Sequence, residues 1–189
     1  HMNIVKRKRH QTEYFNPCDT ASSESFAARL SDSIRTHKCT AHDTIILCIG
    51  TDRATGDALG PIVGSLLAGT SCSYTVYGTL KNPVHALNLR EYIQRIYQSH
   101  CKPFVIAVDA SLGGPSDVGM ITFSHAPLYP GIGVNKKLPA IGDVSITGIV
   151  NLSGKPGLSL LQSTRLYTVH NMAQFISGAI LASESMCFD

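Results

Sequence analysis

The sequence predicts an α/β fold of three layers, in which helices flank both faces of a mostly parallel central sheet. Residues 44–49 and 104–108 are two short, continuous apolar runs rich in β-branched residues, as expected of strands buried on both faces. Segments with apolar residues at helical spacing alternate with these runs. That alternation is typical of a doubly wound sheet with parallel central strands.

Size and composition favour a single globular domain. The chain has 189 residues, of which 43% are hydrophobic and only 15% are charged, whereas charged residues usually make up about 25%. This balance excludes a mostly disordered chain. No apolar run approaches the roughly 20 residues that span a bilayer, so no membrane partner is expected. We predict a flexible basic arm over residues 1–20 and one α/β domain over residues 21–189.

The net charge of +3 depends on one local run, Lys6 to Arg9, because removing these four positive charges changes the balance to −1. Such a run is typical of a solvated arm, and the alternative is contact with nucleic acid or an anionic surface. No aromatic residues are interleaved with the charges, so nucleic acid is not the expected partner.

Cysteine usage points to a reducing compartment. The six cysteines include no CxxC pair, and no apolar leader segment follows the basic run. We therefore expect reduced thiols in a cytoplasmic protein.

In the first half of the sequence, a helix is predicted from Ser22 to about Lys38, because Phe26, Leu30 and Ile34 recur at helical spacing. The buried strand 44–49 follows and is closed by a glycine. A loop then leads into further elements of alternating type. These are a helix over 57–67 and a second strand over 73–77.

In the second half, the buried strand 104–108 lies between elements of weaker pattern. The final helix has the clearest amphipathic spacing, with apolar residues three and four apart from Leu166 to Ile180. The remaining predicted elements are a helix over 83–100, a strand over 118–123, an irregular loop over 125–142 and an edge-like strand over 144–150.

The predicted sheet places a candidate site between strands 44–49 and 104–108. In a flavodoxin-like strand order these two strands are neighbours, and sites in such sheets form beyond the carboxyl ends of the strands at the switch point. Asp57 and Asp109 follow these strands. Each has a structural alternative, Asp57 as a helix N-cap and Asp109 as the cap of a turn.

Two converging carboxylates have defined chemical uses. Because both cannot easily ionise, one keeps a proton near neutral pH. One acid then activates water while the other polarises a carbonyl. The same pair also suits a metal ion. We take Asp57 and Asp109 as the candidate catalytic residues, with no metal expected.

Four further residues are candidates for contacting a substrate. Asp52 and Arg53 lie on the loop before Asp57, where the structural alternatives are an ion pair between them or a solvated cation. Lys136 and Lys137 lie in the irregular loop, and simple solvation is the alternative for both. His85 follows the second strand, so it lies either at the functional edge or on the surface. No P-loop, GxSxG or HExxH motif is present.

The motifs around both acids resemble those of the spore germination protease, and still more those of the shorter, YyaC-type sporulation proteins named as spore proteases. The resemblance covers roughly residues 44–182. It is carried by residues 55–61, 106–110, 135–139, 142–148 and 164–166.

This resemblance implies the fold of hydrogenase maturation endopeptidases and an atypical aspartic peptidase activity. Asp57 and Asp109 match the acids proposed as the catalytic pair of the germination protease. In the hydrogenase relatives the first acid is Glu and a His on a later segment completes a nickel site. The corresponding stretch 145–147 holds no His here, so no cofactor is expected.

Three functional hypotheses follow. The first is an endopeptidase of the forespore or spore interior that cleaves a spore protein, with small acid-soluble spore proteins as the substrate class by analogy. The second is a peptide- or protein-binding spore protein with the same cleft but no catalysis. The third is a metal-dependent maturation peptidase, which the missing His disfavours.

Overall fold

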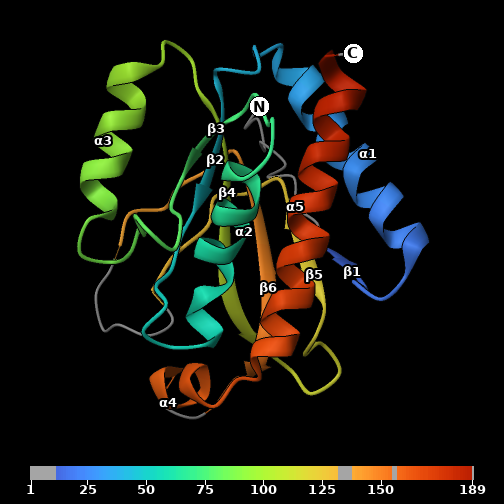
Figure 1. Cartoon of the computed structure of the whole chain (residues 1–189), viewed down its shortest axis with the longest axis vertical. Helices are drawn as coiled ribbons and strands as arrows, with labels where there is room; N and C mark the ends of the chain where they lie inside the picture. The colour runs from blue at the N-terminus through green and yellow to red at the C-terminus, as the bar shows by residue number, and fades with distance from the viewer. Residues whose placement is uncertain (1–11, 132–137, 155–156, 189) are drawn as a thin grey trace, which may run out of the picture.

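The computed structural model describes residues 12–131, 138–154 and 157–188 (Figure 1). The strands are β1 (Glu13–Phe15), β2 (Thr44–Cys48), β3 (Thr75–Tyr77), β4 (Phe104–Gly113), β5 (Ile121–Ser124) and β6 (Val144–Leu152). The helices are α1 (Thr20–His37), α2 (Leu59–Ala68), α3 (Leu89–Ser99), α4 (Gly157–Gln162) and α5 (Leu166–Phe188), with a 3-10 turn η1 (Gly56–Ala58) before α2.

The six strands form one mixed sheet in the order β1-β5-β6-β4-β2-β3. β3, β2, β4 and β6 run parallel, whereas β5 is antiparallel to β6 and β1 is antiparallel to β5. The predicted α/β class and the adjacency of the two apolar strands are therefore confirmed. Because β2 and β4 are neighbours, the loops that follow them meet at the same edge of the sheet.

Helices cover both faces of this sheet, which confirms the three layers. Alternate residues of β2 pack into different clusters: Ile46 joins a core that includes residues of α1, α2 and α5, whereas Leu47 joins a core with residues of α3. Figure 1 shows α3 on one side of the strands and α1 and α5 on the other. Within the described residues, no helix is both long enough and apolar enough to cross a membrane.

The prediction of a flexible arm over residues 1–20 is wrong for residues 13–20, which are part of the folded domain. Glu13–Phe15 form β1, which pairs with β5, and Asp19 caps α1 by accepting a hydrogen bond from the Ala21 N–H at 3.1 Å. Phe15 packs edge-on against Phe26 of α1, with 5.0 Å between ring centroids. The sequence does not reveal this strand, because three residues are too few to show a periodic pattern. The run Lys6–Arg9 lies outside the described residues.

β6 is a central strand rather than the predicted edge strand. It lies between β4 and β5, and the hydroxyl of Thr147 finds its partners inside the sheet. The Thr147 hydroxyl is hydrogen-bonded to that of Thr122 on β5 at 2.6 Å and accepts from the Ser111 hydroxyl on β4 at 3.0 Å. Because the hydroxyls satisfy one another, burial costs far less than the polar sequence suggests.

α3 begins later than predicted, at Leu89 instead of Pro83. Asn88 holds the preceding segment in a turn, because its side-chain oxygen accepts from the His85 N–H at 2.8 Å and its amide nitrogen donates to the Pro83 carbonyl at 3.0 Å. Val84 instead forms a bridge to Ile49 just after β2. This turn brings residues 85–87 to the carboxyl edge of the parallel strands.

Candidate functional site

The loop after β2 folds back over the end of the strand at Gly50. This residue has a φ of +139°, and its N–H donates to the Val84 carbonyl at 2.8 Å. A Cβ at this position would collide with the carbonyl oxygen of Asp57. The close approach and the positive φ both require glycine here, and they place Asp57 against the carboxyl edge of β2.

Asp57 lies in η1 and is half-buried. Its carboxylate does not cap α2, whose first residue follows Ala58 and has no side-chain cap. The Thr51 N–H instead donates to the Asp57 carboxylate at 3.0 Å and to its carbonyl at 3.1 Å. Burial raises the pKa of Asp57, while the hydrogen bond from Thr51 and the nearby charge of His85 oppose that rise. The N-cap alternative is therefore wrong, because the Asp57 side chain accepts its hydrogen bond from Thr51, within the loop that follows β2, and not from the first turn of α2.

Asp109 lies within β4, not after its end as predicted. β4 continues to Gly113 because β6 supplies a partner for that length, and Asp109 pairs with Thr147. The side chain is buried, and one oxygen accepts from the Ala110 N–H at 2.8 Å. Burial and the negative charge of Asp57 raise the pKa of Asp109 well above its ordinary value. Both effects favour the protonated form of this carboxyl.

Asp57 and Asp109 line the same cavity, which has a volume of about 340 Å³. Its wall is built by the β2–η1 loop with η1, the turn before α3, β4, the end of α4 and the residues that flank 132–137. Apolar side chains form much of the wall. They include Ile49, Leu87, Leu138 and Leu161. The cavity is large enough for a few residues of peptide or another small ligand.

The structure brings only some of the predicted substrate-contacting residues to this cavity. Arg53 lies in its wall, while Asp52 is exposed and is not among the lining residues. Among the described residues, no ion pair joins Asp52 to Arg53. Lys136 and Lys137 lie outside the described residues.

His85 is a cavity residue that the sequence left undecided. Its Nδ1 accepts a hydrogen bond from the Leu87 N–H at 3.3 Å, which in the neutral form of the ring puts the proton on Nε2. The ring lies in the cavity wall close enough to Asp57 to influence its pKa. Only the turn held by Asn88 reveals this position, because His85 has no motif of its own.

The α4 helix was not predicted at all, although it supplies Leu161 and Gln162 to the cavity. Asn151 of β6 anchors it by donating to the Leu160 carbonyl at 3.0 Å. Gly56 of η1 packs against Leu161 so closely that a Cβ would displace it. A helix of six residues leaves too short a pattern to recognise in the sequence.

The cavity residues that could bind a metal ion offer mostly oxygen atoms as ligands. The two carboxylates suit a hard cation, and His85 is an imidazole on the same wall. Among the described residues, however, one group of three His, Cys, Asp or Glu side chains brings its ligand atoms within 4.8 Å of one another, and it lies elsewhere: His42, Asp43 and His100.

Comparisons with known proteins place this chain in a family. It is 45% identical over 169 residues to the protein named "Uncharacterized protein YyaC" of Bacillus subtilis (strain 168), covering 89% of this chain and 82% of that protein. A solved structure of the NiFe hydrogenase maturation protease HycI from Thermococcus kodakarensis KOD1 aligns with a TM-score of 0.47 and 20% identity, covering 81% of this chain and 99% of that one. A family profile matches residues 14–179, and the chain thus belongs to the family described as "Protein of unknown function (DUF1256)".

Proposed function

We propose that this protein is an endopeptidase in which Asp57 and Asp109 hydrolyse a peptide bond. The observation that carries the proposal is the contrast between the two carboxyl groups in one cavity. Asp109 is buried and its pKa is raised well above the ordinary range, whereas the pKa of Asp57 is raised against the opposing effects of Thr51 and His85. Two acids whose environments push their pKa values apart are suited to opposite roles.

The roles follow from protonation. Asp57, the more easily ionised, acts as the general base and takes a proton from a water molecule as the water oxygen bonds to the scissile carbonyl carbon. Asp109, still protonated, donates its proton to the carbonyl oxygen. Asp57 then passes its proton to the leaving nitrogen while the C–N bond breaks, and the product carboxyl returns a proton to Asp109. Both acids recover their initial states.

The cavity wall supports a peptide as the substrate class. Leu87, Leu138 and Leu161 supply an apolar lining suited to a hydrophobic side chain next to the scissile bond. Arg53 supplies a positive charge on the same wall, suited to a carbonyl or carboxylate of the substrate. In the finer form of this proposal the substrates are small acid-soluble spore proteins and the site of action is the forespore or spore interior, by the resemblance to sporulation proteins.

Cleavage tests the proposal directly. The full chain is incubated with a proteome-derived peptide library and, separately, with an extract of spore proteins, and new termini are identified by mass spectrometry. We expect cleavage by the wild type and a loss of at least about a hundredfold in Asp57→Asn and Asp109→Asn, the scale of a general acid or base contribution. Asp32→Asn is the matched control, because Asp32 is an exposed carboxylate of α1 outside the cavity.

The same experiment separates catalysis from binding. Peptides retained equally by the wild type and both Asn variants, with no new termini, would replace the peptidase with a peptide-binding protein. Cleavage of the library but not of spore proteins would keep the peptidase and reject the spore substrates. Cleavage that survives both substitutions would reject the two-carboxylate mechanism.

A further inference from the structure

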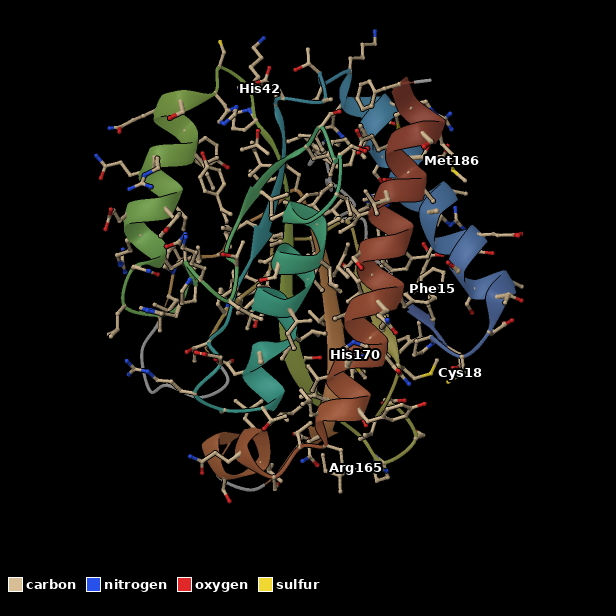
Figure 2. All side chains as sticks on the ribbon, viewed as in Figure 1. Phe15, Cys18, His42, Arg165, His170 and Met186 are labelled. Carbon is tan, nitrogen blue, oxygen red and sulfur yellow. The ribbon has the colours of Figure 1, made fainter. Side chains whose placement is uncertain are left out.

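A second group of chemically active side chains lies at the opposite edge of the sheet. Asp43 immediately precedes β2, and His100 directly follows α3, four residues before β4. The parallel register pairs Thr44 with Phe104, and the Phe104 N–H donates to the Asp43 carbonyl at 2.8 Å. The start of one strand is therefore beside the start of the next. Figure 2 shows His42 at one end of the molecule and Arg165, which lies between α4 and α5, at the other.

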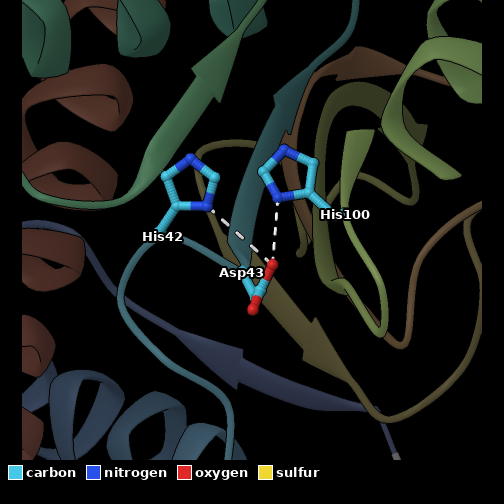
Figure 3. Close-up of side chains that lie close together, drawn as sticks. All are labelled: His42, Asp43 and His100. Carbon is cyan, nitrogen blue, oxygen red and sulfur yellow. Dashed lines mark hydrogen bonds and ion pairs between the residues drawn. The ribbon is translucent and has the colours of Figure 1, made fainter. Parts of the chain in front are cut away.

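Two imidazoles converge on one carboxylate oxygen in this group. The Nδ1 atoms of His100 and His42 lie 3.1 Å and 3.9 Å from the same Oδ1 of Asp43. The two rings are 4.8 Å apart between centroids and inclined by 37°. Figure 3 shows both interactions meeting at that oxygen, with the rings on either side of it. All three residues offer ligand atoms within 4.8 Å of one another.

The separations between these ligand atoms are close to those found in a zinc site. Zinc binds imidazole nitrogen at about 2.0–2.1 Å and carboxylate oxygen at about 2.0–2.2 Å, so the ligand atoms of a tetrahedral site are roughly 3.3–3.5 Å apart. The two observed separations lie on either side of that range. His42 has 77% of its side chain exposed, so a rotation of its ring closes the longer separation at little cost. We propose that His42, Asp43 and His100 bind a divalent transition metal ion of the zinc type, with a fourth position open to water.

Two of the three ligands are already held in place. His100 has only 3% of its side chain exposed, and Asp43 is tied down by Thr40, whose hydroxyl donates to Asp43 Oδ2 at 3.1 Å and accepts from its N–H at 3.1 Å. This bonding uses Oδ2 and leaves Oδ1 for the imidazoles.

The third ligand has a fixed backbone. The Thr75 hydroxyl of β3 donates to the His42 carbonyl at 2.9 Å, and this bond ties the loop before β2 to the neighbouring strand. A bound ion would join this loop to the end of α3 and so tie the helical layer to the amino edge of the sheet. The site is distinct from the carboxylate cavity, because no residue of the group lines that cavity.

The test uses the full chain, stripped of metal by a chelator and dialysed, with zinc sulfate as the probe. Zinc binding is measured by calorimetry and by competition with a chromophoric chelator, and Co²⁺ is used as a visible reporter of nitrogen and oxygen ligands. We expect the wild type to bind one equivalent of zinc at these residues. His42→Ala and Asp43→Asn should each weaken it at least tenfold, since even groups that only orient metal ligands contribute about 10–100-fold.

Three controls decide the outcome. His42 is exposed, so His42→Ala is expected to fold normally, which circular dichroism checks. His170→Ala removes an exposed histidine of α5, and Asp109→Asn alters the carboxylate cavity; neither should change the affinity of this site. Equal binding by the wild type and His42→Ala, or no binding at all, would overturn the proposal and leave His100 and Asp43 as a hydrogen-bonded pair without a metal. Binding lost in Asp109→Asn would place the ion in the cavity instead.

Discussion

The backbone N–H of Thr51 donates to both the carboxylate and the carbonyl oxygen of Asp57, at 3.0 Å and 3.1 Å. One donor thus fixes the direction of the carboxylate and the path of the loop that carries it. A hydrogen bond to an ionised carboxylate favours the charged form. In the proposed mechanism this arrangement suits Asp57 to the role of base and the buried Asp109 to the role of acid.

The pH profile of the proposed peptidase should depend on His85. The nearby charge of His85 lowers the pKa of Asp57, so His85→Asn should raise it. The base is then protonated at a higher pH, so the acid limb of the kcat/KM profile should shift to higher pH. The measurement is cleavage of one library-derived peptide across the pH range. His170→Asn serves as the control, and an unmoved acid limb in His85→Asn would separate His85 from the titration of Asp57.

Asp109→Asn should change how stability depends on pH. The carboxyl titrates near about pH 3.9 in the unfolded chain, and its pKa in the folded state is much higher. The stability that the protonated group contributes is therefore fully present below that unfolded value and is lost as the pH rises through the folded value. Asn cannot ionise, so the variant does not share this loss. Between the unfolded and the folded pKa, the free energy of unfolding of the variant should therefore rise relative to that of the wild type as the pH increases. Urea unfolding at several pH values measures it, and parallel curves would contradict a raised pKa.

Gly50→Ala should destabilise the protein more than Gly119→Ala. Both glycines have a positive φ, but a Cβ at Gly50 would strike the Asp57 carbonyl, whereas nothing lies within 4 Å of one at Gly119. Backbone strain of about 1–2 kcal/mol applies to both, and the collision should add about 1–3 kcal/mol at Gly50. Chemical denaturation measures the difference, and equal losses would mean that the loop moves aside freely.

Gly178→Ala should stabilise the protein. Gly178 lies in the interior of α5 with no positive φ, and a Cβ there would meet no atom within 4 Å. Alanine reduces the entropy lost on folding, which is worth roughly 0.5–1 kcal/mol in a helix interior. A rise in the denaturation midpoint with an unchanged slope is the expected result. A fall would indicate an undescribed contact at this face of the helix.

The sequence predicts the centre of this fold better than its margins. The strands at 44–49 and 104–108 stand out because they are apolar on both faces, and their adjacency brings Asp57 and Asp109 to one cavity. β6 was misjudged because the Thr147 hydroxyl is satisfied by Thr122 and Ser111, partners that only the folded sheet provides. The position of His85 likewise depends on hydrogen bonds of Asn88, which no periodic pattern encodes.

The strand β1 has a consequence for how the protein behaves when cut. The free edge of a sheet offers unpaired N–H and C=O groups that other chains can join. β1 shields the side of β5 that faces away from β6, along Ile121–Phe123, and Phe15 keeps it seated against Phe26. Proteolysis between Phe15 and α1 would allow β1 to dissociate and would leave the backbone N–H and C=O groups of β5 unpaired. We therefore expect cleaved molecules to associate through β5 before they unfold.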